Sequence, residues 1–229
     1  MLQRSTILPI LFGILSVCIV VIEPYVGFGF YAVNKALLMP TLAIWILATK
    51  TYHPSARWIV FGLIFSCLGD VFLLFQDQQS GFFIAGLASF LTTHILYIIS
   101  FLKLKSPQSK MINGFPIISA LIVFYGIALV NYLYPNLHAL TPAVIVYSLV
   151  ICSMLISTLL VISKDNINAS IATIAGAASF VISDSILAIN KFSHPITYSG
   201  ALIMGTYCLA QFLIVWATIH RFSVNNPAQ

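Results

Sequence analysis

Two aspartates stand in stretches that would otherwise suit the interior of a lipid bilayer. The stretch FSCLGDVFLLF places Asp70 among apolar neighbours, and FVISDSILAI does the same for Asp184. Lys35 and His94 also lie within long apolar runs. An ionisable residue inside a membrane span is costly, usually faces the interior of the helix bundle, and commonly marks a functional site. These four residues are therefore the first candidates for chemistry.

The depths of these residues indicate what chemistry they could perform. With about 1.5 Å of rise per residue, Lys35 and Asp70 are expected roughly 8 Å below one membrane interface and Asp184 roughly 9 Å below the same one. His94 is expected deeper, near the midplane, with Tyr97 on the same helix face. One lysine cannot compensate two acids, so one acid is expected to be protonated and the other ionised. Such an unequal pair of carboxyls is typical of general acid–base catalysis.

Each of these residues also has a structural interpretation. Lys35 could extend its ammonium group to the membrane interface. Asp70 and Asp184 could form structural ion pairs with Lys35, and His94 could form a hydrogen bond between helices. The catalytic interpretation depends on the four groups acting together. The sequence predicts this only through the shared depth of Lys35, Asp70 and Asp184, with His94 below them.

The composition places the whole chain in a membrane. Of the 229 residues, 60% are hydrophobic and 7% are charged, and the mean hydropathy is +1.04. Soluble domains carry about 25% charged residues, so a soluble globule is excluded and a single integral membrane domain over residues 1–229 is expected. Apart from Lys35, the basic residues are scattered through loops, which argues against a nucleic-acid partner. The four cysteines match no metal or redox motif.

Apolar segments of spanning length predict an all-α membrane protein with about eight transmembrane helices. The segments lie near 5–22, 30–49, 57–75, 81–102, 113–133, 139–162, 169–190 and 197–220. An even number of spans places both termini on one side. Eight Lys and Arg residues then fall on the side of the termini: Arg4, Lys50, Arg57, Lys103, Lys105, Lys110, Lys164 and Arg221. The loops of the other side hold only Lys191, so both termini are predicted to be cytoplasmic, and the bacterial inner membrane is the expected location.

A short internal similarity suggests a parallel 4+4 repeat. Gly69-Asp70-x-x-Leu73-Leu74 near the end of the third segment resembles Ser183-Asp184-x-x-Leu187-Ala188 near the end of the seventh. Segments four spans apart run in the same direction. Such a duplication would place the two acids opposite one another.

The order of the polar residues resembles a known family. Along the chain stand Asn34-Lys35 with Pro40, Gly69-Asp70, Gly86, Phe90, His94, Tyr97, Ser183-Asp184, Gly205, Tyr207 and Gln211. This pattern, with eight short-looped spans over nearly the whole chain, resembles the YhhN family, whose characterised members are lysoplasmalogenases. The resemblance implies catalytic roles for Asp70 and Asp184. It implies substrate-binding or supporting roles for Asn34, Lys35, Phe90, His94, Tyr97, Ser183, Tyr207 and Gln211.

The resemblance also implies an ether-bond hydrolase. Its reaction would be hydrolysis of the vinyl ether of a lysoplasmalogen, which yields a fatty aldehyde and a glycerophospho-alcohol. The implied partners are the lysophospholipid substrate and the lipid bilayer. No metal, no organic cofactor and no obligate protein partner is implied.

The chemistry of this reaction agrees with the residues. The scissile bond of a lysophospholipid lies just below its headgroup, at the depth expected for Lys35, Asp70 and Asp184. Vinyl ether hydrolysis begins with protonation of a carbon and forms an oxocarbenium ion, so it needs one protonated acid and one carboxylate. We predict Asp184 as the proton donor and Asp70 as the carboxylate beside Lys35, unless Lys35 binds the lipid phosphate instead. The hydrocarbon chain is expected to run past Phe90 toward His94.

Three other functions fit parts of this pattern. A proton-coupled small-molecule transporter could use the same buried acids, although transporters commonly have helices broken at the midplane. A metal-dependent hydrolase could use Asp70, His94 and Asp184 as ligands, although zinc sites usually take several His or Cys ligands. An intramembrane aspartyl protease would need a glycine where Cys67 stands.

Overall fold

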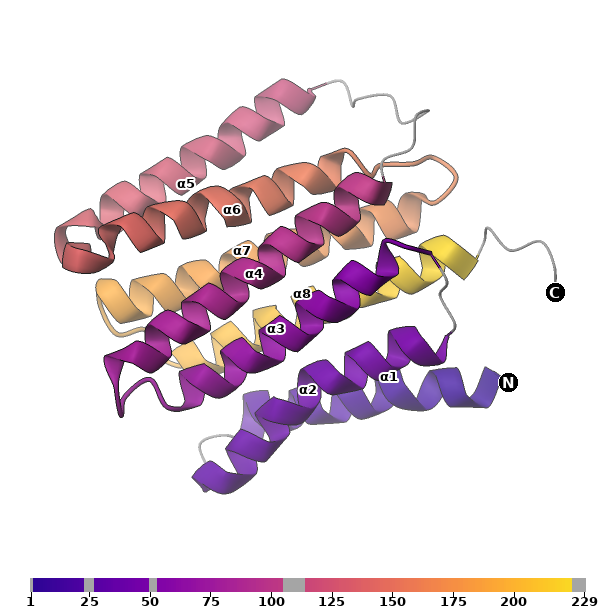
Figure 1. Cartoon of the computed structure of the whole chain (residues 1–229), viewed down its shortest axis with the longest axis horizontal. Helices are drawn as coiled ribbons and strands as arrows, with labels where there is room; N and C mark the ends of the chain where they lie inside the picture. The colour runs from indigo at the N-terminus through magenta and orange to yellow at the C-terminus, as the bar shows by residue number, and fades with distance from the viewer. Residues whose placement is uncertain (1, 23–26, 50–52, 105–113, 224–229) are drawn as a thin grey trace.

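A computed structural model describes residues 2–22, 27–49, 53–104 and 114–223, and all regular elements in these ranges are helices. Figure 1 shows them as an elongated bundle of roughly parallel and antiparallel rods. The α-helices are α1 (Leu2–Val17), α2 (Phe28–Ala48), α3 (Ala56–Leu74), α4 (Ser80–Leu104), α5 (Phe115–Leu137), α6 (Thr141–Leu159), α7 (Ile167–Phe192) and α8 (Ser199–Ser223). A π-helical turn, η1 (Cys18–Ile22), continues α1, and a 3₁₀ turn, η3 (His138–Leu140), joins α5 to α6.

Length and hydropathy identify the chain as an integral membrane protein. Six helical stretches within the described residues are long and apolar enough to cross a bilayer. One of them is a continuous stretch of 45 residues, Phe115–Leu159, which contains α5, η3 and α6, while the apolar stretch Thr6–Val21 is shorter. The all-α membrane fold is therefore confirmed, whereas the prediction of eight spans and of a 4+4 repeat stays a prediction. Lys50, Lys105 and Lys110 of the predicted charge asymmetry lie outside the described residues.

The bundle is organised around two closely packed helix pairs, α3 with α4 and α7 with α8. Helix α2 packs on α3, and α6 packs on both α4 and α7. Helix α5 lies at one edge of the bundle against α6 and α7, and α1 lies with α2 at the opposite edge (Figure 1). Helix α1 begins and α8 ends at the same end of the molecule.

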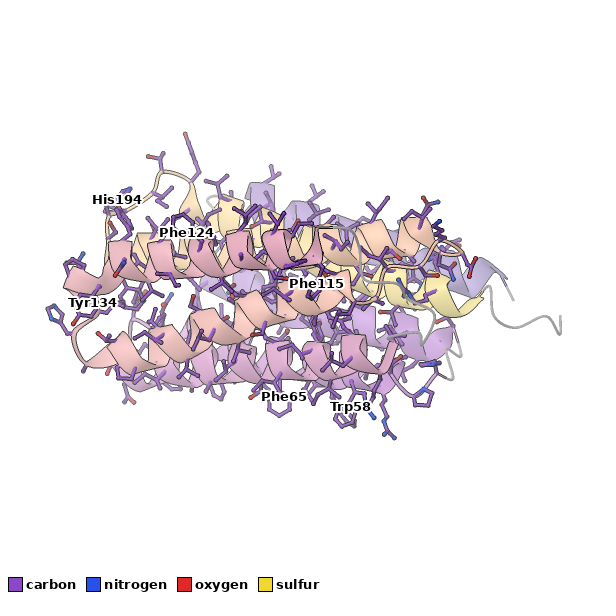
Figure 2. All side chains as sticks on the ribbon, turned by 90° about the horizontal axis from the view of Figure 1, so that it is seen from above. Trp58, Phe65, Phe115, Phe124, Tyr134 and His194 are labelled. Atoms are coloured by element: carbon purple, nitrogen blue, oxygen red, sulfur yellow. The ribbon has the colours of Figure 1, made fainter. Side chains whose placement is uncertain are left out.

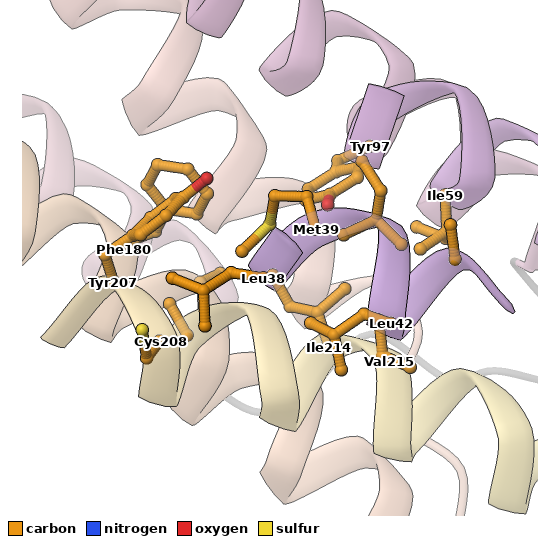
Figure 3. Close-up of a cluster of buried hydrophobic side chains, with 14 of the residues drawn as sticks. Leu38, Met39, Leu42, Ile59, Tyr97, Phe180, Tyr207, Cys208, Ile214 and Val215 are labelled. Carbon is orange, nitrogen blue, oxygen red and sulfur yellow. The ribbon is translucent and has the colours of Figure 1, made fainter. Parts of the chain in front are cut away.

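The core lies where α2, α3, α4, α7 and α8 converge, as Figure 3 shows. Its fully buried side chains include Leu38, Met39, Ile59, Phe180 and Ile214. By contrast, large apolar and aromatic side chains project from the outer helix faces in Figure 2, with Phe124 of α5 69% exposed and Tyr134 60% exposed. An apolar outer surface is what a surrounding bilayer requires.

Two glycines let α3 and α4 approach closely beside the first acid. A Cβ atom at Gly69 would lie 2.7 Å from the ring of Phe90, and one at Gly86 would lie 2.8 Å from Leu73. Small residues permit such close packing of membrane helices. The pair of glycines therefore holds the Phe90 ring and the Leu73 side chain next to Asp70.

Candidate active site

The carboxylate of Asp70 is buried and has two partners from different helices. The Tyr207 hydroxyl of α8 donates a hydrogen bond of 2.7 Å to Oδ2, and Lys35 Nζ of α2 lies 3.7 Å from Oδ1. Asp70 is 2% exposed, Tyr207 is 3% exposed and Lys35 is 8% exposed. The ammonium group of Lys35 therefore lies beside a buried carboxylate, as predicted from the sequence. It does not extend to the membrane surface.

The carboxylate of Asp184 also has two partners, from α4 and α6. The Tyr147 hydroxyl lies 2.5 Å from Oδ2, and His94 Nε2 lies 3.3 Å from the same oxygen. The Tyr147 hydroxyl and His94 Nε2 are 3.0 Å apart. The three side chains thus form one compact group. Asp184 and Tyr147 are half-buried, with the Asp184 side chain 14% exposed, whereas the His94 side chain is completely buried.

The tautomer of His94 follows from its contacts. Among the described residues, Nδ1 is buried with no hydrogen-bond partner. A neutral imidazole carries its proton on one nitrogen. A proton on Nε2 can be donated to Asp184, whereas a proton on Nδ1 would have no acceptor. We therefore assign the Nε2–H tautomer, in which His94 is a donor to the second acid.

Both acids line one polar cavity of about 280 Å³. Lys35 and Tyr207 line it beside Asp70, and Ser183 lines it beside Asp184. Three polar side chains also line the cavity: Gln76 just beyond α3, Asn190 near the end of α7 and Ser199 at the start of α8. The cavity thus joins two carboxyl groups, a cation and several hydrogen-bonding groups in one space, as the shared depth of these residues predicted.

A second pocket, of about 70 Å³, adjoins the polar cavity and is apolar. Leu87, Leu129, Val130 and Val144 from α4, α5 and α6 form part of its wall. Four residues line both spaces: Leu73, Phe90, Asp184 and Leu187. Asp184 therefore stands on the wall between a polar space and an apolar one.

The other predicted site residues lie outside the two cavities. Tyr97 donates a hydrogen bond of 2.6 Å to Gln211 Oε1, and Gln211 Nε2 donates one of 3.0 Å to Ser66. Both Tyr97 and Gln211 are completely buried. Asn34 donates to the Leu15 carbonyl at 3.3 Å. These hydrogen bonds link α3, α4 and α8 to one another, and α2 to α1, outside the two cavities.

Two features of α4 and α6 could not be read from the sequence. His94 is completely buried and lines neither cavity, with Asp184 and Tyr147 in contact with it. The path of the hydrocarbon chain past Phe90 toward His94 stays a prediction. Tyr147 was not predicted as a site residue. A lone tyrosine in an apolar helix resembles any packed aromatic residue, so only the packing of α6 against α4 and α7 identifies it.

No group of three or more His, Cys, Asp or Glu side chains in the described part of the chain is arranged to hold a metal ion. In particular, Asp70 and His94 belong to separate groups of contacts, around Lys35 and around Asp184. The set of Asp70, His94 and Asp184 therefore has no geometry of a shared metal site.

Comparisons with known proteins identify relatives of this chain. The chain is 35% identical over 192 residues to human "Lysoplasmalogenase TMEM86A", covering 79% of this chain and 75% of the relative. It is 34% identical to the Bos taurus protein of the same name, with the same coverage. It is 28% identical over 190 residues to "Lysoplasmalogenase" of Mycobacterium tuberculosis, covering 79% of this chain and 70% of the relative. No solved structure matches the chain. The model of the YhhN family matches residues 30–218, and the chain belongs to the YhhN family.

Proposed function

We propose that this protein is a lysoplasmalogenase that hydrolyses the vinyl ether of a lysoplasmalogen to a fatty aldehyde and a glycerophospho-alcohol. Relatives that cover most of the chain carry the name lysoplasmalogenase. The observation that carries the mechanism is the single cavity lined by both Asp70 and Asp184. A polar cavity that adjoins an apolar pocket suits a molecule with a headgroup and one hydrocarbon chain.

In the proposed first step, Asp184 donates a proton to the vinyl ether carbon remote from oxygen. Its Oδ2 already accepts from Tyr147 and His94, so we place the transferable proton on Oδ1. The same two donors then stabilise the carboxylate that forms, which is electrostatic assistance directed at developing charge. The substrate becomes an oxocarbenium ion.

In the second step, Asp70 takes a proton from the attacking water. Its ionised form is supported by Lys35 at 3.7 Å and by the hydrogen bond from Tyr207. A carboxylate also stabilises the adjacent cation until water adds, much as in glycoside hydrolysis. The resulting hemiacetal separates into the aldehyde and the alcohol as its hydroxyl proton passes to the leaving oxygen. The proton that Asp70 took from water returns to Asp184 for the next cycle.

The direct test compares two substrates with purified protein in detergent or lipid. A lysoplasmalogen should release aldehyde, and the corresponding saturated ether should not, because it has no double bond to protonate. A proton-coupled transporter would release aldehyde from neither. Absence of aldehyde from lysoplasmalogens of several headgroups would refute the proposed function.

Tyr147→Phe tests the group around Asp184. The variant removes one hydroxyl that lies 2.5 Å from the carboxylate and keeps the ring. A hydrogen bond to a charged group contributes about 1.5–3 kcal/mol, so kcat should fall about tenfold or more, with a smaller change in KM. Tyr134→Phe removes a hydroxyl from a side chain that is 60% exposed and serves as the control. Equal activity of both variants would show that Tyr147 only packs.

We further infer that the chain contains a parallel 4+4 duplication with eight spans. Gly62 and Gly176 precede Asp70 and Asp184 by the same number of residues. Under the repeat, α2 and α8 around α3 correspond to α6 and α4 around α7. Asp70 receives its partners from α2 and α8, and Asp184 receives its partners from α6 and α4. The contacts of the two acids thus support the duplication.

For topology we propose one membrane domain with both termini in the cytoplasm. Asp77 and Lys164 lie in exposed turns on opposite sides under this arrangement. In intact cells, a cysteine replacing Asp77 should react with a membrane-impermeant thiol reagent, and a cysteine replacing Lys164 should react only after permeabilisation. The unsubstituted protein gives the background from native cysteines. The opposite pattern would reverse the orientation and the membrane leaflet from which substrate enters.

A further inference from the structure

We propose that the apolar pocket between α4, α5, α6 and α7 is the binding site for the alkenyl chain of the substrate, with α5 as its outer wall. This inference rests on the proposed function and extends it by assigning the chain to one pocket. It predicts that residues of α5, far along the chain from both acids, determine chain selectivity.

The pocket lies beside the polar cavity that both acids line. Leu73, Phe90, Asp184 and Leu187 line both spaces, so these four side chains form the boundary between the pocket and the cavity. A lysoplasmalogen has its vinyl ether at the junction between headgroup and chain. If the headgroup occupies the cavity with Lys35, and the chain occupies the apolar pocket, the vinyl ether crosses the wall at Asp184. On this route the reacting bond lies beside the proposed proton donor.

The pocket has an apolar wall. Its lining between α5 and α6 consists mainly of aliphatic side chains, including Leu129, Val130, Leu133 and Ile151. Each methylene group transferred to such surroundings from water contributes about 0.8 kcal/mol. A hydrocarbon chain is therefore the ligand that this wall can bind, and a polar headgroup is not.

Helix α5 is held on α7 by two contacts near the pocket. The Tyr125 hydroxyl donates a 2.7 Å hydrogen bond to Ser185, the neighbour of Asp184. The Tyr132 hydroxyl lies 3.0 Å from Ser193 Oγ. Most of the other α5 side chains are exposed, and among the described residues only Gly126, Leu133 and Leu137 of this helix are buried. One face of α5 therefore closes the pocket, and the opposite face meets the bilayer.

A bulky side chain on α5 should fill the pocket and so test the proposal. Val130 lines the pocket, whereas Ile127 on the same helix is 56% exposed and does not line it. We expect Val130→Trp to lower kcat/KM for a substrate with an alkenyl chain of about sixteen carbons by about tenfold or more, since several methylenes lose their contacts. Activity toward a chain of about four carbons should stay within about twofold. Ile127→Trp, the matched control, should leave both substrates unchanged.

A second variant and a binding measurement complete the design. Ser148→Leu fills the pocket from α6 and carries the same expectation if Val130→Trp does not fold. Binding of saturated alkyl lysophospholipids, which are not hydrolysed, should weaken in both variants, more for the long chain than for the short one. Equal effects on long and short chains, or no effect on binding, would overturn the assignment of the pocket. Absence of aldehyde from the unsubstituted protein would instead refute the proposed function, and the binding comparison would still decide the pocket.

Discussion

Asp184→Asn is expected to lower turnover of a lysoplasmalogen by about a hundredfold or more. The substitution keeps the size of the side chain and its contacts with Tyr147 and His94 but removes the proton that the vinyl ether must receive. A positioned general acid contributes about 10²- to 10⁴-fold in rate. Because Tyr147 and His94 approach Oδ2 at 2.5 and 3.3 Å, the variant should fold and should still bind substrate. The expected loss is therefore in kcat.

Asp165→Asn provides the control for this loss, because Asp165 is an exposed acid between α6 and α7. It should keep full activity. Thermal unfolding of both variants in detergent separates a catalytic loss from a folding defect. Near-normal turnover of a folded Asp184→Asn protein would make Asp184 a structural residue, and the mechanism with two carboxyl groups would fail.

Much of the fold could be predicted because hydropathy alone limits where a membrane helix can lie. Each predicted segment overlaps one of the helices α1–α8, and all the elements described are helical. The ends of α5 and α6 were the hardest to predict. These helices join through η3 in one continuous apolar stretch, Phe115–Leu159, so hydropathy gives no sharp boundary there.

The partners of the two acids were not equally predictable. Lys35 and Asp70 could be paired because both are charged, both are rare in spans, and both lie at one depth. Tyr147 could not be paired with Asp184 in this way, since a tyrosine in a span has no such rarity. Its role depends on α6 packing between α4 and α7, which is a tertiary fact. The internal repeat is the one sequence signal that could have directed attention to α6.

The two acids also differ in a way that their similar sequences conceal. Asp70 is paired with the amino group of a lysine, whereas the partners of Asp184 are a phenol and an imidazole. If the site arose by duplication, the two halves kept the position of the carboxyl group and diverged in what surrounds it. Different surroundings are what separates an acid from a base in one active site.

Asp70→Asn is expected to lower turnover by about a hundredfold or more as well, and pH distinguishes its role from that of Asp184. An essential base must be ionised, so activity falls when the base is protonated at low pH. An essential acid must be protonated, so activity falls when the acid is ionised at high pH. The unsubstituted protein should therefore give a bell-shaped profile, whose limbs belong to the coupled pair of carboxyl groups. The residual activity of Asp70→Asn should no longer decrease on the acid side of the pH profile. The residual activity of Asp184→Asn should no longer decrease on the alkaline side.

Lys35→Met tests the ion pair within the same profile. Lys35 Nζ lies 3.7 Å from Asp70, and a nearby cation favours the ionised form of a carboxyl group. Its removal should therefore displace the acid limb, and the alkaline limb less, because the two acids are coupled. Asp77→Asn, which changes an exposed acid beyond α3, should displace neither limb. The measurement is turnover across the range from mildly acidic to mildly alkaline pH in one detergent. If Asp70→Asn lost the alkaline limb instead, the two acids would exchange roles, and Asp70 would be the residue that protonates the vinyl ether.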